Sequence, residues 1–184
     1  MPVTQIYLVR HGEPDYEPID SRGWPGRAAD SAPLTALGMK QAEELADILG
    51  GIRATYLVSS PFTRALHSAA IIGHRLALGV KVDYDLRDWL PDHTGLWRSA
   101  ADVRAAQAEF ETYDGEWPDG IQRSWEPLSR VRERARAALA RHTASTDGPV
   151  LAITHATVIR ALTGERNTAH GTHEYYRIGP EIGA

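Results

Sequence analysis

The chain has 184 residues, of which 42% are hydrophobic and 24% are charged, and its formal net charge is −4. This length fits one domain with a single core, and no stretch approaches the run of about 20 apolar residues that a membrane helix needs. The charge gives no general attraction to nucleic acid or anionic lipid, and the lack of cysteine excludes disulfides, thiolate metal ligands and cysteine nucleophiles.

The first predicted element is a strand at residues 3–9, a short apolar run with β-branched side chains. It ends abruptly at the polar residues 10–13. Residues 14–33 contain four prolines and several charges, which is typical of a long loop with a function. The start of the chain lacks the basic and apolar regions of a signal peptide, so we expect a cytoplasmic protein.

The pattern of strand, loop and helix then repeats. Thr35 is the expected N-cap of a helix over residues 36–49, which two glycines end. Residues 56–58 form a second predicted strand, and a helix is predicted over 62–78. The junction between this strand and its helix is polar, like the end of the first strand.

The second half of the chain begins with a predicted strand at 80–86. Residues 88–125 are rich in Trp and Asp, with a short predicted helix at about 100–110. We interpret 88–125 as a cap-like insertion over a site, within one domain that spans residues 1–184. The remaining predicted elements are a helix at 127–142, a strand at 150–154, a helix at 156–162 and an edge strand at 175–178.

Alternating strands and helices favour an α/β fold, a three-layer sandwich with a mostly parallel central sheet and helices on both faces. Ligands of such sheets bind at the carboxyl ends of the strands. Arg10 and His11 follow the first predicted strand, residues 59–64 follow the second, and His155 follows a late one. We therefore expect these residues to meet at one edge of the sheet.

These residue types suit a phosphoryl group, because arginine donates bidentate hydrogen bonds to phosphate oxygens and stays charged. An unprotonated imidazole can attack phosphorus. The charge that develops then needs fixed donors, for which Arg10, Arg64 and a protonated His155 are of the right types. The leaving oxygen also needs a proton from a nearby acid.

Five segments in chain order carry a family likeness: LVRHGE at 8–13, PLTALGMKQA at 33–42, SSPFTRA at 59–65, LRD at 86–88 and ITHA at 153–156. Together they resemble the histidine phosphatase superfamily, also called the phosphoglycerate mutase-like family. They span most of the chain in the family's order, so the combination is far more specific than any one segment. The resemblance implies the phosphoglycerate mutase-like fold and a reaction that needs no metal and no cofactor.

The same resemblance implies roles for individual residues. His11 is the nucleophile, and Arg10, Arg64 and His155 hold the phosphoryl group together with it. Asp88 stands where the family places its acid, usually a glutamate, and is one methylene shorter. For that role we expect burial or a neighbouring carboxylate to raise the pKa of Asp88 above about 3.9.

Other residues leave alternatives open. Asp92 is a rival to Asp88 as the acid. Arg22 and Arg27, in the loop after the nucleophile, are candidates for binding a second anionic group of the substrate. His170 and His173 superficially resemble a metal pair, but no cysteine or carboxylate motif accompanies them, so no metal site is expected.

The helix at 127–142 is rich in arginine, and its arginines are spread around the helix without an aromatic or glycine-rich RNA motif. We interpret them as a solvated helix face. They are Arg130, Arg132, Arg134, Arg136 and Arg141. The expected substrate is a small phosphorylated metabolite, with no nucleic acid or membrane as partner, and the sequence leaves the oligomeric state open.

Three functions are compatible with this sequence. The one favoured is a phosphatase that hydrolyses a phosphomonoester through a phosphohistidine on His11. The second is phosphoglycerate mutase-type phosphotransfer, but mutases of the family are generally longer, with a larger loop and tail. The third is a non-catalytic domain that binds a phospho-ligand, which the retained site residues oppose.

Overall fold

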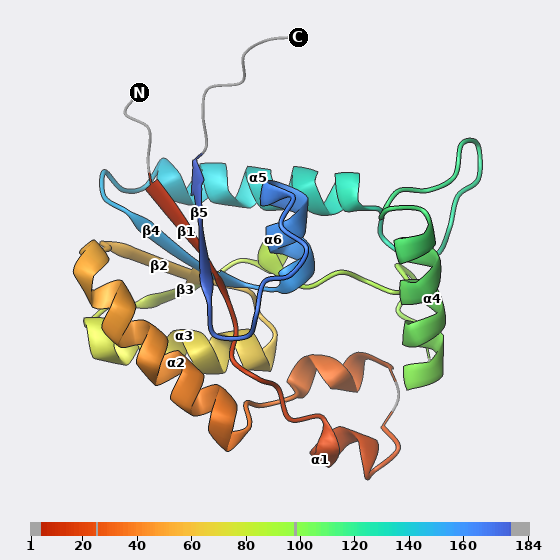
Figure 1. The fold of residues 1–184 in the computed structure, drawn as a ribbon, viewed down its shortest axis with the longest axis horizontal. Coiled ribbons are helices and arrows are strands. Elements are labelled where there is room, and N and C mark those ends of the chain that lie inside the picture. Colours follow the sequence, from red (N-terminus) through yellow and green to blue (C-terminus); the bar gives the residue numbers. More distant parts are fainter. Residues whose placement is uncertain (1–4, 25, 98, 178–184) are drawn as a thin grey trace, which may run out of the picture.

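The computed structural model describes residues 5–24, 26–97 and 99–177, which form an α/β fold around a five-stranded sheet (Figure 1). The strands are β1 Gln5–Arg10, β2 Tyr56–Ser59, β3 Val80–Val82, β4 Val150–Thr154 and β5 His173–Arg177. The helices are α1 Glu17–Asp20, α2 Ala36–Leu49, α3 Thr63–Leu76, α4 Ala100–Thr112, α5 Leu128–Thr143 and α6 Ala156–Thr163, with 3-10 turns η1 Gly26–Ser31, η2 Gly50–Ile52 and η3 Tyr84–Leu86.

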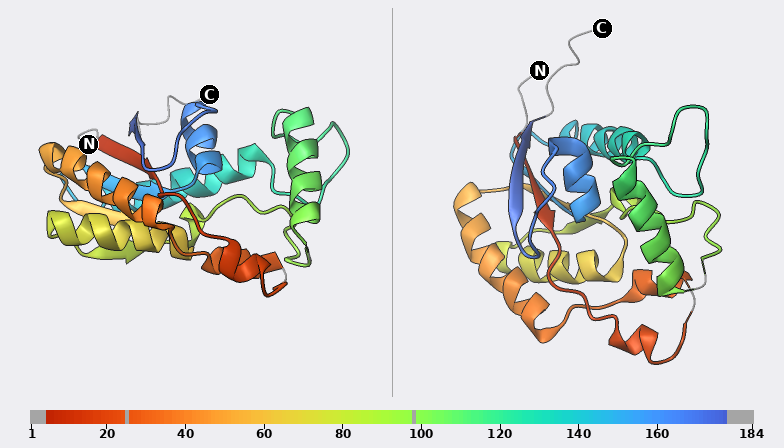
Figure 2. Two further views of the ribbon diagram at one scale, coloured as in Figure 1. Left: turned by 60° about the horizontal axis from the view of Figure 1, so that its bottom comes forward. Right: turned by 45° about the vertical axis from the view of Figure 1, so that its right-hand side comes forward.

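The strand order is β3-β2-β4-β1-β5, with every pair parallel except β1 and β5. The sheet lies between two helical layers, so the predicted three-layer α/β fold is confirmed (Figure 2). Successive side chains of each strand point to opposite faces of the sheet. Val9 and Leu151 pack with α2 and α3, whereas Leu8 and Ala152 pack with α5 and α6. The carboxyl ends of β1, β2 and β4 therefore lie side by side, with a core on both faces.

Helix α4 stands at the end of the molecule in Figure 1, away from the strands. A third apolar cluster, with Phe110, Trp125 and Val131 among its members, joins α4 to α5 and α6. The interpretation of residues 88–125 as a cap-like insertion in a single domain stays a prediction. Within the described ranges, no helix is both long and apolar enough to cross a membrane.

The predicted strand at 80–86 is wrong in its second half. Strand β3 ends at Val82, because the side chain of Asp83 accepts a hydrogen bond from the backbone N–H of Asp85 and caps the 3-10 turn η3. The long loop at 14–33 contains two short helical segments, α1 and η1. The ends of two predicted strands, at residues 3, 4 and 178, lie outside the described residues.

The first turn of α2 packs directly on the loop that follows β1. Thr35 is the N-cap, as predicted, and its hydroxyl accepts from the N–H of Gly38 at 2.9 Å and donates to the carboxylate of Glu13 at 2.7 Å. A Cβ atom on Gly38 would lie 2.2 Å from the carbonyl oxygen of Glu13. Glycine at position 38 is therefore required by this close approach of two backbones.

The substitution Gly38→Ala tests this packing. The added methyl group must push the loop off α2, so we expect the free energy of unfolding in urea to fall by roughly 1–3 kcal/mol. Gly51→Ala is the matched control, because a Cβ there meets nothing within 4 Å. Equal stability of the two variants would contradict the close approach.

Candidate active site

His11 lies at the carboxyl end of β1 and is buried, with 4% of its surface exposed. Its backbone N–H donates to the carbonyl of Thr154 at 3.2 Å, which fixes it against β4. Its Nδ1 lies 2.7 Å from the carbonyl oxygen of Gly12. Because a carbonyl can only accept, this contact assigns the proton to Nδ1 and leaves a lone pair on Nε2.

Arg64, in the first turn of α3, faces that lone pair. Its Nε donates to His11 Nε2 at 3.3 Å, and its Nη2 donates to Asp88 Oδ2 at 2.8 Å. Burial, and then the charge of Arg64, lower the pKa of His11 to about 3. The imidazole of His11 is therefore an unprotonated base held beside a guanidinium at neutral pH.

His155 follows β4 and is completely buried. Its Nε2 lies 2.8 Å from the hydroxyl of Ser60, and its ring centroid is 5.0 Å from that of His11. Burial holds the pKa of His155 well below its usual range, although Asp88 opposes the effect. The expectation of a protonated His155 is wrong for this structure, because desolvation outweighs the neighbouring carboxylate.

Asp88 joins the same cluster from the segment after η3. Its Oδ2 lies 2.8 Å from Arg64 Nη2 and 3.3 Å from His155 Nδ1, and its Oδ1 accepts from the N–H of Trp89 at 2.9 Å. Burial opposes ionisation of Asp88, but the neighbouring imidazole of His155 and the guanidinium of Arg64 outweigh burial and lower the pKa of Asp88. The expectation of a raised pKa is wrong, because the nearest charged group is a cation.

The Arg10 side chain contacts the loop before β5. Its guanidinium donates to the carbonyl of Thr168 and lies 2.8 Å from His170 Nε2. The ring centroid of His170 is 5.5 Å from that of His11. The loop before β5 therefore contributes a histidine to the site. Sequence reasoning did not place His170 at the site, because only the pairing of β5 with β1 brings the loop that carries His170 to the end of β1.

The remaining candidates lie further out. Asp92 accepts from the N–H and hydroxyl of Thr94, at 2.8 and 2.7 Å, so it caps a turn. The guanidinium of Arg22 lies over the Trp24 ring, 5.3 Å from its centroid, and that of Arg27 lies 5.9 Å from the centroid of Trp97. Their contact with substrate stays a prediction. Among the described residues, no three His, Asp or Glu side chains are grouped as metal ligands would be.

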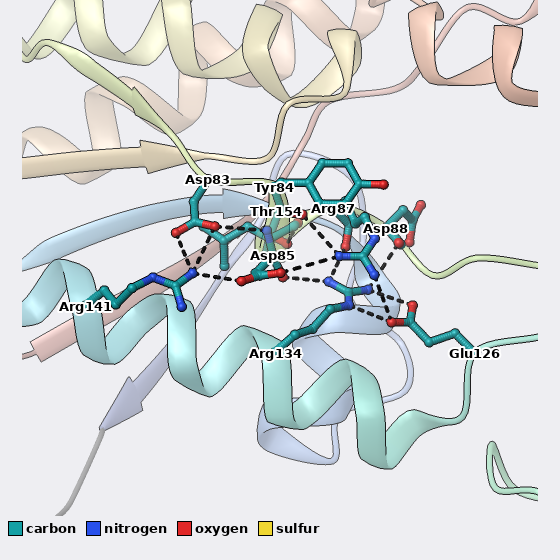
Figure 3. Close-up of polar contacts among 10 residues, drawn as sticks. Asp83, Tyr84, Asp85, Arg87, Asp88, Glu126, Arg134, Arg141 and Thr154 are labelled. Carbon is teal, nitrogen blue, oxygen red and sulfur yellow. Dashed lines mark hydrogen bonds and ion pairs between the residues drawn. The ribbon is translucent and has the colours of Figure 1, made fainter. Parts of the chain in front are cut away.

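Asp88 is held in place by a buried polar network (Figure 3). Arg134 of α5 donates to the backbone carbonyls of Asp85, Arg87 and Asp88 at 2.6, 2.8 and 3.2 Å. Both oxygens of Glu126 accept from Arg134, at 2.8 and 2.9 Å. The interpretation of Arg134 as part of a solvated face is therefore wrong, since its side chain is only 10% exposed.

A cavity of about 270 Å³ opens beside Arg64 and Asp88. It is bounded by η1, by the segment after η3 and by α4. Two of the five tryptophans, Trp89 and Trp97, line it, together with Phe62. The site therefore consists of a polar cluster at the strand ends, next to a cavity whose walls combine aromatic and polar side chains.

The chain matches known proteins over most of its length. Residues 6–177 match the model of the histidine phosphatase superfamily (branch 1). The chain is 32% identical over 175 residues to glucosyl-3-phosphoglycerate phosphatase of Mycobacterium tuberculosis. The match covers 89% of this chain and 75% of that protein. It is 29% identical over 164 residues to the uncharacterized phosphatase PhoE of Bacillus subtilis, and this match covers 89% of this chain and 77% of that protein. A solved structure of mycobacterial glucosyl-3-phosphoglycerate phosphatase is similar with a TM-score of 0.68 and 27% identity, covering 89% of this chain and 79% of that one.

The network around Arg134 predicts a large difference between two arginines of α5. Arg134→Met leaves Glu126 partly unpaired and three carbonyls without their donor, so we expect the free energy of unfolding to fall by roughly 3 kcal/mol. Arg141→Met is the control, because the side chain of Arg141 is 52% exposed and its ion pairs contribute at most about 1 kcal/mol. Urea unfolding of both variants measures this, and similar losses would contradict the account.

The lowered pKa of His11 predicts how stability depends on pH. The unfolded chain binds a proton at His11 below its ordinary pKa of about 6.5, whereas the folded chain does not until about pH 3, so stability falls as the pH drops through this window. In His11→Asn, we expect stability to fall by about 1.4 kcal/mol less per pH unit than in the wild type. Denaturant unfolding between about pH 6 and pH 4.5 measures the slope.

His74→Asn, which replaces an exposed histidine of α3, controls for the substitution itself. If His11→Asn keeps the slope of the wild type, His11 is not a neutral, buried base in the folded protein.

Proposed function

Because this chain belongs to the histidine phosphatase superfamily, we propose that it hydrolyses a phosphomonoester through a phosphohistidine on His11. The prediction of a histidine phosphatase is confirmed by the match of residues 6–177 to the family and by the phosphatase names of its relatives. The phosphohistidine, the roles of individual residues and the substrate belong to the proposal.

The observation that carries the proposal is the arrangement of His11 and Arg64. His11 Nε2 carries an unprotonated lone pair, because Nδ1 donates to Gly12, and this lone pair accepts a hydrogen bond from the guanidinium of Arg64. A guanidinium at this point can hold phosphate oxygens within reach of the nucleophile. Nucleophile and anion ligand thus occupy adjacent positions at the strand ends.

In the first step, the lone pair on Nε2 forms a bond to phosphorus and the bond from phosphorus to the alcohol oxygen breaks. Arg10, Arg64 and His155 hold the equatorial oxygens, where charge is greatest in the transition state. The departing oxygen takes a proton from Asp88. The phosphoryl dianion competes with Asp88 for Arg64 and adds negative charge beside it, and both effects raise the pKa of Asp88 toward the value that a proton donor needs.

In the second step, the Asp88 carboxylate accepts a proton from water, the water oxygen bonds to phosphorus and the bond from phosphorus to Nε2 breaks. Inorganic phosphate leaves and His11 is again neutral. Asp88 has a shorter side chain than the family's usual glutamate, and the distance of 2.8 Å from its Oδ2 to Arg64 supports the assignment. Asp92 is the weaker candidate, since its carboxylate is engaged at Thr94.

The proposed substrate is a small phosphorylated metabolite, and the proposed location is the cytoplasm. Glucosyl-3-phosphoglycerate phosphatase, whose name states its substrate, shows that a relative of similar fold acts on a sugar-linked phosphomonoester. We propose hydrolysis rather than phosphoglycerate mutase-type transfer, in agreement with the names of the mycobacterial and Bacillus relatives. A protein of Salmonella arizonae that is 30% identical over 150 residues is named a probable phosphoglycerate mutase, so this choice belongs to the proposal.

Two variants test the assigned roles. His11→Ala should lose at least about 10³-fold in kcat on every ester, in the presence of excess EDTA, because the reaction has no other nucleophile. Asp88→Asn should lose about 10² to 10⁴-fold on benzyl phosphate, whose alkoxide needs a proton, and much less on 4-nitrophenyl phosphate, whose leaving group does not.

Asp92→Asn is the control for Asp88 and should keep the activity of the wild type on both esters. Turnover that survives in His11→Ala would refute the nucleophile, and equal losses of Asp88→Asn on the two esters would refute the acid. Loss of activity in EDTA would refute a metal-independent reaction.

A further inference from the structure

The cavity beside the phosphoryl site gives information about the alcohol portion of the substrate. It shares Arg64 and Asp88 with the site, so a group esterified to a phosphoryl held by Arg64 lies next to it. Cavities of on the order of 150 Å³ hold a benzene molecule in proteins. The volume of about 270 Å³ is therefore sufficient for one ring with its substituents.

The walls of this cavity are partly apolar and partly polar, and the uncharged polar lining residues are Tyr16, Gln107 and Thr157. The apolar lining residues are Ala29, Phe62, Trp89, Leu90, Pro91, Trp97, Val103 and Phe110. The indole N–H of Trp89 is already used, because it donates to the carbonyl of Glu126 at 2.7 Å. Aromatic walls of this kind bind flat or aliphatic groups by burial of apolar surface and by ring stacking.

Among the described residues, the charged members of the lining are three carboxylates and one guanidinium: Asp30, Asp88, Glu111 and Arg64. Arg64 is engaged by Asp88 at 2.8 Å, and Glu111 is paired with Arg160 at 2.7 Å. Asp30 is the carboxylate whose charge is poorly compensated, since burial raises its pKa to about 6 despite the charges of Arg64 and Arg27.

A second anionic group on the substrate would meet unfavourable conditions here. A carboxylate or phosphate loses its hydration in a cavity and needs a cation to replace it. Among the described lining residues, the guanidinium is that of Arg64, which the proposed function assigns to the phosphoryl group. Arg27 lies outside the lining, over the ring of Trp97, and faces Asp30.

We infer that the substrate carries an uncharged alcohol portion with an aromatic or other apolar face, and that Asp30 excludes alcohols bearing a second anionic group. This inference rests on the proposed function. It assigns a specificity-determining residue in η1, a turn within the loop that follows the nucleophile. It also separates the substrate of this chain from phosphoglycerates, which carry a carboxylate close to the phosphate, and therefore from the glucosyl-3-phosphoglycerate after which the mycobacterial relative is named.

The test uses three esters with nearly the same leaving group: benzyl phosphate, 4-carbamoylbenzyl phosphate and 4-carboxybenzyl phosphate. The amide and the carboxylate have similar shapes, so the ratio of their kcat/KM values isolates the charge. At about pH 7.5 the wild type should prefer the amide over the carboxylate at least about tenfold, and benzyl phosphate should be a good substrate.

Asp30→Asn should reduce this preference by at least about threefold, since it removes the repelling charge. Asp20→Asn is the matched control, because Asp20 is exposed at the end of α1 and lies outside the cavity lining. It should keep the preference of the wild type.

The wild type gives an independent reading that needs no variant. Asp30 becomes protonated as the pH falls through its pKa of about 6, whereas the substrate carboxylate stays largely ionised down to about pH 5. The ratio of kcat/KM for the amide to kcat/KM for the carboxylate should therefore fall between about pH 7.5 and about pH 5.5. The groups that face Asp30 are Arg27, Arg64 and Asp88, with Tyr16 nearby. Titration of the phosphate is common to both esters and cancels in the ratio.

Equal kcat/KM values for the amide and the carboxylate in the wild type would overturn the inferred substrate class. A preference that neither Asp30→Asn nor lower pH reduces would overturn the role of Asp30. Failure of the proposed function has a different result, because the wild type would then hydrolyse none of the three esters.

Discussion

The geometry of the site depends on Thr154, the last residue of β4. Its carbonyl accepts the backbone N–H of His11 at 3.2 Å, and its hydroxyl donates to the carbonyl of Leu86 at 2.8 Å. One fully buried residue thus fixes the strand end that carries His11 and the segment that carries Asp88. His155 is the next residue in the chain. A parallel sheet supplies this arrangement because its strand ends are adjacent, and the side chain of Thr154 extends it to a segment outside the sheet.

Charge balance at this edge sets the protonation states. Arg64 lies between a neutral histidine, His11, and an ionised carboxylate, Asp88. Burial favours the neutral form of every group here, yet the proximity of Arg64 keeps Asp88 ionised. A bound phosphoryl group would replace Asp88 as the partner of Arg64. In the proposed reaction, the same guanidinium thereby links phosphate binding to protonation of Asp88, and this link would allow an aspartate with a lowered pKa to serve as a proton donor.

The sequence predicted the sheet, the helices on its faces and the residues that meet at the strand ends, because hydrophobic periodicity, Thr35 and the motif segments are local signals. It did not predict what depends on tertiary packing. Arg134 looked like a solvated arginine, but the carbonyls of the segment after η3 and Glu126 bury it. The protonation of His155 and the pKa of Asp88 were predicted with the wrong sign, because desolvation and the distance to Arg64 cannot be read from residue order. The role now inferred for Asp30 depends on the cavity in the same way.

The most direct test of the account is to locate the transferred phosphoryl group. The wild-type protein is quenched in alkali during turnover of 4-nitrophenyl phosphate, which preserves phosphohistidine, and its peptides are analysed by mass spectrometry. The account predicts a phosphoryl group on His11, formed at least as fast as the steady-state turnover. A phosphoryl group on His155 or on another residue, or hydrolysis with His11 unmodified throughout, would contradict it.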